Sequence, residues 1–61
     1  MQVPIEAQVR CIEREITMRE RVYPRWVESK RLTQRKADEE MEAMRAVLAT
    51  LQTIAAGQRL I

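Results

Sequence analysis

The chain has 61 residues, with eleven Lys and Arg against nine Asp and Glu, no His, one Cys and one Gly. A chain of this length buries only about 60% of its unfolded surface, and it has neither a cysteine pair nor a zinc-ligand set to stabilise a small core. Without histidine or a glycine-rich phosphate loop, catalysis is disfavoured, so we expect a protein that is not an enzyme and binds no cofactor or metal.

The abundance of helix formers and the shortage of turn residues predict an all-α protein. Its first predicted element is an amphipathic helix over about residues 4–22, because apolar residues recur there at helical spacing. This stripe consists of Ile5, Val9, Ile12, Ile16 and Tyr23, with Arg19 at the position between the last two. A second apolar strip, about a third of a turn away, consists of Ala7, Cys11, Met18 and Val22. The remaining positions form a solvated face that carries both signs of charge.

Pro24 predicts that this helix ends or kinks near Val22, because proline disfavours the α conformation of the residue before it. A short helical turn is expected over residues 24–32. The segment contains the only two aromatic residues of the chain, Tyr23 and Trp26, and it opens the most basic region. Aromatic rings stack on bases and guanidinium groups grip phosphates. The predicted contact residues for a ligand or partner are Arg21, Tyr23, Arg25, Trp26, Lys30, Arg31 and Arg35. The alternative is that both rings only cap the end of the helical core.

The second predicted helix covers about residues 34–56, with Thr33 as its N-cap and a hydrophobic staple between Leu32 and Ala37. Its apolar seam has strict heptad spacing and consists of Ala37, Met41, Met44, Leu48, Leu51 and Ala55, widened by Ala43, Val47 and Ile54. Gly57 predicts the end of the helix, which leaves residues 57–61 as a tail whose apolar end, Leu60 and Ile61, needs a packing partner. Arg35 and Lys36 lie in the first turn, where the helix dipole disfavours cations.

These elements predict one helical-hairpin domain over residues 1–61. Two antiparallel helices touch along one seam only, and the spare apolar strips would stay exposed. We therefore expect self-association into a helical bundle, as a homodimer or a larger closed assembly. The predicted oligomer interface consists of Ile5, Val9, Ile12, Ile16, Met41, Met44, Val47, Leu48, Leu51 and Ile54.

Three classes of function fit this sequence. The first is a small binding or inhibitory module that presents the aromatic and basic segment to a host protein or a nucleotide-like signal. The second is a nucleic-acid-binding regulator, which the mixed charge of both helices disfavours because it leaves no continuous basic stripe. The third is a structural homo-oligomer. No secretory signal or membrane-spanning stretch is visible, and the cysteine is free, so we expect a cytoplasmic protein without a membrane partner.

The core Val22-Tyr23-Pro24-Arg25-Trp26-Val27, with flanking residues between positions 9 and 52, resembles a group of short proteins encoded in phages and prophages of proteobacteria. The flanking matches are Glu13-Arg14-Glu15-Ile16, Met18-Arg19, Gln34, Lys36-Ala37-Asp38 and Met44. In similar proteins a glycine often occupies the position of Lys30. The resemblance carries over no functional residue. It implies an accessory or counter-defence factor in the host cell, of the kind that blocks or sequesters a host component by stoichiometric binding.

Overall fold

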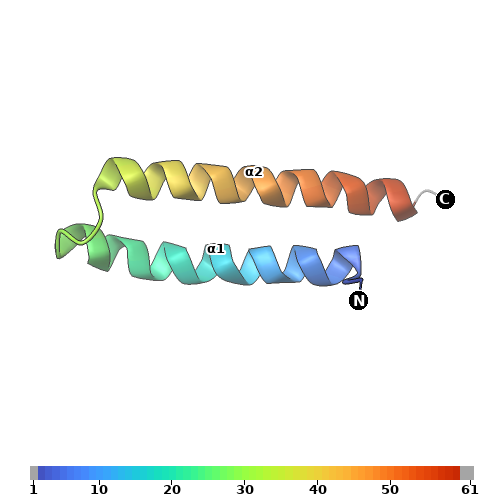
Figure 1. The fold of residues 1–61 in the computed structure, drawn as a ribbon, viewed down its shortest axis with the longest axis horizontal. Coiled ribbons are helices and arrows are strands. Elements are labelled where there is room, and N and C mark those ends of the chain that lie inside the picture. Colours follow the sequence, from blue (N-terminus) through green and yellow to red (C-terminus); the bar gives the residue numbers. More distant parts are fainter. Residues whose placement is uncertain (1, 60–61) are drawn as a thin grey trace.

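Two long antiparallel helices joined by a short connection form the hairpin, as Figure 1 shows. The computed structural model describes residues 2–59, and only the backbone of residue 59. Helix α1 spans Ile5–Glu28 and helix α2 spans Gln34–Arg59, within an outline of 48 × 20 × 17 Å. The all-α helical hairpin expected from the sequence is confirmed. The packing expected for Leu60 and Ile61 falls outside the described residues.

The core of the hairpin is the seam between α1 and α2. Ile16 and Tyr23 of α1 pack with Ala37 and Met41 of α2, and each of these four side chains is at most 8% exposed. The heptad seam predicted for α2 faces α1 along its whole length, since all six of its residues are buried or half-buried. No large side chain in the described part of the chain is fully buried, however. The core is therefore one layer thick.

Helix α1 does not end near Val22 but continues through Pro24 to Glu28, so the predicted break at the proline is wrong. Proline removes the hydrogen bond to the carbonyl of Glu20, and both residues are exposed, so water reaches this position. Tyr23 and Val27 lie four residues apart on the seam and both pack into the core. A break between them would turn one side chain away from α2, and we infer that their packing offsets the effect of the proline.

The connection closes with a Schellman motif at the end of α1. The N–H of Arg31 donates to the carbonyl of Trp26 at 2.8 Å, and the N–H of Lys30 donates to the carbonyl of Val27 at 3.1 Å. Lys30 adopts the left-handed conformation that this motif requires, with φ 64°, in a position where glycine is normally preferred. The residues after Lys30 then lead directly into Thr33 and α2.

We expect Lys30→Gly to raise the free energy of unfolding by about 1 kcal/mol, because a side chain at positive φ is strained by about 1–2 kcal/mol and the gain is partly offset by the freer unfolded chain. Urea denaturation followed by circular dichroism at one fixed protein concentration measures the change. Lys30→Ala is the matched control, since it removes the same charge but keeps the Cβ atom. Equal stabilisation by both variants would show that charge, rather than backbone strain, is responsible.

Helix α2 begins as predicted. The hydroxyl of Thr33 accepts a hydrogen bond from the N–H of Lys36 at 3.1 Å, and Leu32 packs against the core cluster that contains Ala37. Its predicted end at Gly57 is wrong, because the helix continues through Gly57 to Arg59 and the glycine keeps a negative φ. A glycine permits a left-handed helix end but does not impose one. Neither helix in the described region has the length and apolar character to cross a membrane.

Candidate functional site

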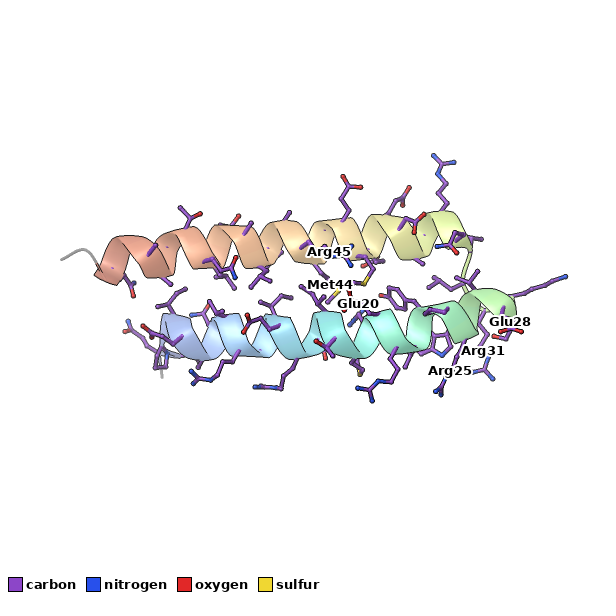
Figure 2. All side chains as sticks on the ribbon, turned by 180° about the vertical axis from the view of Figure 1, so that it is seen from behind. Glu20, Arg25, Glu28, Arg31, Met44 and Arg45 are labelled. Carbon is purple, nitrogen blue, oxygen red and sulfur yellow. The ribbon has the colours of Figure 1, made fainter. Side chains whose placement is uncertain are left out.

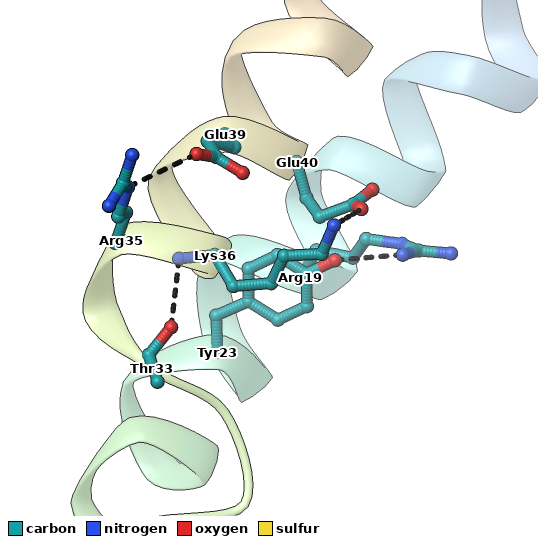
Figure 3. A network of polar contacts seen from close by, with 7 residues as sticks. All are labelled: Arg19, Tyr23, Thr33, Arg35, Lys36, Glu39 and Glu40. Carbon is teal, nitrogen blue, oxygen red and sulfur yellow. Dashed lines mark hydrogen bonds and ion pairs between the residues drawn. The ribbon is translucent and has the colours of Figure 1, made fainter.

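Tyr23, one of the predicted contact residues, belongs to the core. Its ring is 6% exposed, and its hydroxyl accepts a hydrogen bond from Nη1 of Arg19 at 2.8 Å (Figure 3). The guanidinium carbon of Arg19 also lies 5.9 Å from the centre of the tyrosine ring. The ring therefore contributes mainly to the seam of the hairpin, and only its edge reaches a surface hollow shared with Gln34 and Asp38.

Arg19 holds the polar edge of this core. Its Nη2 lies 3.1 Å from the Glu15 carboxylate, while Nη1 binds the hydroxyl of Tyr23. The hydrogen bond with Tyr23, followed by that with Glu15, raises the pKa of the Arg19 guanidinium above its usual value. Its Nε is buried without a hydrogen-bond partner among the described residues. Arg19 thus occupies the one position of the apolar stripe that carries a polar side chain.

Trp26 lies outside the core. It is 41% exposed, and its ring centre is 5.8 Å from that of Tyr23 with the two planes tilted by 40°. The backbone carbonyl of Trp26 accepts hydrogen bonds from the N–H groups of Arg31 and Leu32, so its main chain helps to close the connection. Capping of the core thus describes Tyr23, whereas the indole of Trp26 remains available for contact.

The predicted basic residues separate into two places. Figure 2 shows Arg25 and Arg31 projecting on the side of α1 that faces away from α2. Arg35 instead starts α2, where its Nε pairs with Glu39 at 3.4 Å, and Lys36 pairs with Glu40 at the same distance (Figure 3). The cations in the first turn of α2 are therefore compensated by neighbouring acids. We define the basic end by Arg21, Arg25, Lys30 and Arg31, all of which are exposed.

One lateral side of the hairpin is apolar. A hollow there joins Ala7, Cys11 and Ile12 of α1 to Leu51 of α2, and Cys11 is exposed rather than buried. Helical spacing extends the same side along both helices. We call it the apolar lateral face, and it consists of Val3, Ala7, Cys11, Val22, Trp26, Met44, Val47, Leu51 and Ile54. Met18 lies at its edge. The five exposed large hydrophobic residues of the described chain are all on or beside this face.

The opposite lateral side is polar. There Glu20 of α1 and Arg45 of α2 form an ion pair at 2.9 Å, which joins the two helices (Figure 2). Acidic and amide side chains continue this side in both directions, and they are Glu6, Glu13, Gln34, Asp38 and Gln52. The hairpin therefore presents two chemically different flanks.

The predicted oligomer-interface residues divide between the seam and the apolar lateral face. Ile16 and Met41 are buried between α1 and α2 of the same chain, so they are not available to a second copy. Val47 and Ile54 are 48% and 46% exposed and lie on the apolar lateral face. The others are half-buried at the border of the seam, and they are Ile5, Val9, Ile12, Met44, Leu48 and Leu51.

One arrangement of charge was not predicted from the sequence. Arg10 and Arg14 were assigned to a mixed solvated face, but they lie in line with Arg21 and Arg25 on the outer side of α1. The 4-7-4 spacing of these arginines was the available signal. We call these four residues the arginine strip. A shallow surface hollow runs along part of it, lined by Arg10, Glu13, Arg14, Thr17, Met18 and Arg21.

Comparison of the chain with protein-family models, with curated proteins and with solved structures found no match. In the part of the chain that the structure describes, no three potential metal ligands come together. The surfaces that the structure does offer are the apolar lateral face, the exposed indole of Trp26 and the outward-facing arginines. These groups suit binding through apolar contact and charge.

Proposed function

We propose that the protein is a non-enzymatic binding protein that works as a homo-oligomer, with the apolar lateral face as the surface where copies meet. The observation that carries this proposal is the difference between the two flanks. The exposed apolar side chains of both helices gather on one side, including Val47, Ile54 and Trp26, while the other side is polar. Exposed apolar surface that is gathered in this way usually marks an interface.

A second copy of the chain suits the charge of this face. The charged residues beside the face are already paired within the chain, Glu15 with Arg19 and Lys36 with Glu40, so an approaching copy meets no uncompensated charge from these residues. A two-fold contact places the same face on both copies and produces a four-helix bundle. This bundle would also give the one-layer core of the hairpin the second layer that it lacks.

The resemblance to short phage and prophage proteins supports a role in the cytoplasm of the host cell. There the oligomer would inhibit or sequester a host component, either a nucleotide signal or a host protein, by stoichiometric binding. The basic end supports this role because its guanidinium groups are exposed next to the free indole of Trp26. Such groups bind phosphates and carboxylates through paired hydrogen bonds.

We expect Arg25→Ala to abolish ligand binding and to leave the melting temperature almost unchanged, because Arg25 is exposed and forms no ion pair among the described residues. Calorimetric titration with linear and cyclic nucleotides, together with capture of partners from host lysate, measures binding. Thermal denaturation of the same samples measures stability.

Arg35→Ala is the matched control, since it removes an exposed arginine from a different surface. It should bind as the wild type does. Ligand binding at the basic end is contradicted if wild type and Arg25→Ala behave alike in both binding assays. It is also contradicted if Arg25→Ala unfolds the protein and leaves binding intact.

A further inference from the structure

The arginine strip lies on the side of α1 that points away from α2. At about 100° per residue, its four arginines fall within an arc of about 60° around the helix axis. Between Arg10 and Arg25 there are fifteen residue steps, which correspond to about 22 Å along a helix. All four side chains are exposed. The strip is therefore straight, and it is already ordered by the helix that carries it.

These arginines differ from most of the other cations whose side chains the structure describes. Arg19, Arg35, Lys36 and Arg45 each pair with a carboxylate within 3.4 Å. None of the four strip residues forms an ion pair or a side-chain hydrogen bond within the described part of the chain.

Two pairs of the strip, Arg10 with Arg14 and Arg21 with Arg25, even place like charges four residues apart, which destabilises a helix. A local rule broken without internal compensation points to a surface kept for a partner.

The charges of α1 are sorted, although its five arginines and five glutamates balance. Glu6, Glu13 and Glu20 repeat every seven residues and line the polar flank beside α2. Glu15 is on the opposite flank, paired with Arg19. Of the acids of α1, only Glu28 shares the arc of the strip, and it lies at the C-terminal end. Glu13 borders the strip, because it lines the same hollow as Arg10 and Arg14 as well as the polar flank. The arginines therefore face outward, and the acids lie along one edge of the strip.

We propose that the arginine strip binds the phosphate backbone of double-stranded nucleic acid. A guanidinium group grips a phosphate with two parallel hydrogen bonds, and a straight row of them matches a regularly charged rod. A duplex is favoured over a single strand because single-strand binding relies on aromatic stacking. The exposed aromatic ring, Trp26, is about 100° around α1 from Arg25 and does not belong to the strip.

This binding depends on the phosphate charge of the duplex and not on its base sequence, because contacts to phosphate position a protein without specifying bases. The strip borders the apolar lateral face, since Arg25 lies at the same angle around α1 as Ala7. Arg10, Arg14 and Arg21 lie about 20–60° farther from that face, so these three stay accessible in a single chain and in a bundle built on it. The inference therefore does not depend on the oligomer of the proposed function. Arg10 and Arg14 are also absent from the basic end, which allows the two surfaces to be tested separately.

The test is fluorescence anisotropy of a labelled 20-base-pair random-sequence DNA duplex, titrated with the full chain between 50 and 200 mM NaCl. Four phosphate contacts predict a slope of log K against log salt of about −3.6, a loss of affinity of about 150-fold over this range. In the double variant Arg10→Gln/Arg14→Gln the slope should become shallower, at about −1.8, so that affinity decreases only about 12-fold over the same salt range. The variant should keep the helix content of the wild type by circular dichroism.

Arg35→Gln/Lys36→Gln is the matched control, because it removes the same charge from the paired cations of α2. It should retain a slope close to that of the wild type. Equal loss in both double variants would overturn the proposal, since it would show attraction by net charge alone. No binding at 50 mM NaCl, or binding to vesicles of anionic phospholipid but not to the duplex, would also overturn it. Arg25 belongs to both surfaces, so the distinction between them depends on Arg10 and Arg14. Loss of duplex binding in Arg10→Gln/Arg14→Gln, with nucleotide or host-protein binding unchanged, assigns the duplex to the strip and not to the basic end.

Discussion

Tyr23→Ala is expected to lower the free energy of unfolding by about 3–5 kcal/mol, which is the range for truncating a large buried aromatic side chain. Tyr23 is 6% exposed and is the only aromatic residue in a core whose other members are Ile16, Ala37 and Met41. Its packing, together with that of Val27, is also what we infer to offset the effect of Pro24 on α1. A small domain has little stability in reserve, so much of this variant should be unfolded at room temperature.

Guanidinium denaturation followed by helix content measures this loss, at the same protein concentration for every variant. Tyr23→Phe is the matched control, because it keeps the ring and removes only the hydroxyl that accepts the hydrogen bond from Arg19. It should lower stability by about 1 kcal/mol. If Tyr23→Ala were no more destabilising than Tyr23→Phe, the ring would not be a core residue, and the alternative view of Tyr23 as a ligand contact would regain support.

Val47→Glu is expected to dissociate the oligomer. Val47 is 48% exposed at the middle of the apolar lateral face, so a glutamate there is tolerated in a single hairpin. In a two-fold bundle the substitution occurs twice, and each buried unpaired carboxylate costs about 3–5 kcal/mol. The protein should therefore lose its partner and melt at a lower temperature, because the bundle no longer stabilises the hairpin.

Size-exclusion chromatography with light scattering and a thermal melt measure both effects. Ala49→Glu adds the same charge at an exposed position of α2, on the polar flank that also carries Arg45 and Gln52. This control should keep the mass and the melting temperature of the wild type. Dissociation by Ala49→Glu with no effect of Val47→Glu would place the interface on the other flank.

Periodicity and capping were sufficient to predict the main architecture. The heptad seam of α2 and the N-cap at Thr33 occur as expected, because both depend on local spacing that a helix enforces. The breaks expected at Pro24 and Gly57 do not occur. Both residues weaken a helix locally, and at Pro24 we infer that the tertiary packing of Tyr23 and Val27 offsets this effect. A single sequence does not show the strength of such packing.

The candidate surfaces were predicted less completely, since they depend on the direction in which α2 lies. Tyr23 and Trp26 are only three residues apart and were expected to act together, yet one is in the core and the other is 41% exposed. The charges of α1 looked mixed along the sequence. They separate into a polar flank and an outer arginine strip only when the seam with α2 fixes which side of α1 faces outward.

If copies of this hairpin meet through the apolar lateral face, as we propose, the wild-type protein is an oligomer in solution. Sedimentation equilibrium from low to high micromolar concentration measures its mass. The predicted result is a mass of two or more times the 7.2 kDa of one chain, with full helix content. A folded, helical species of 7.2 kDa throughout this range would show that copies do not meet through this face.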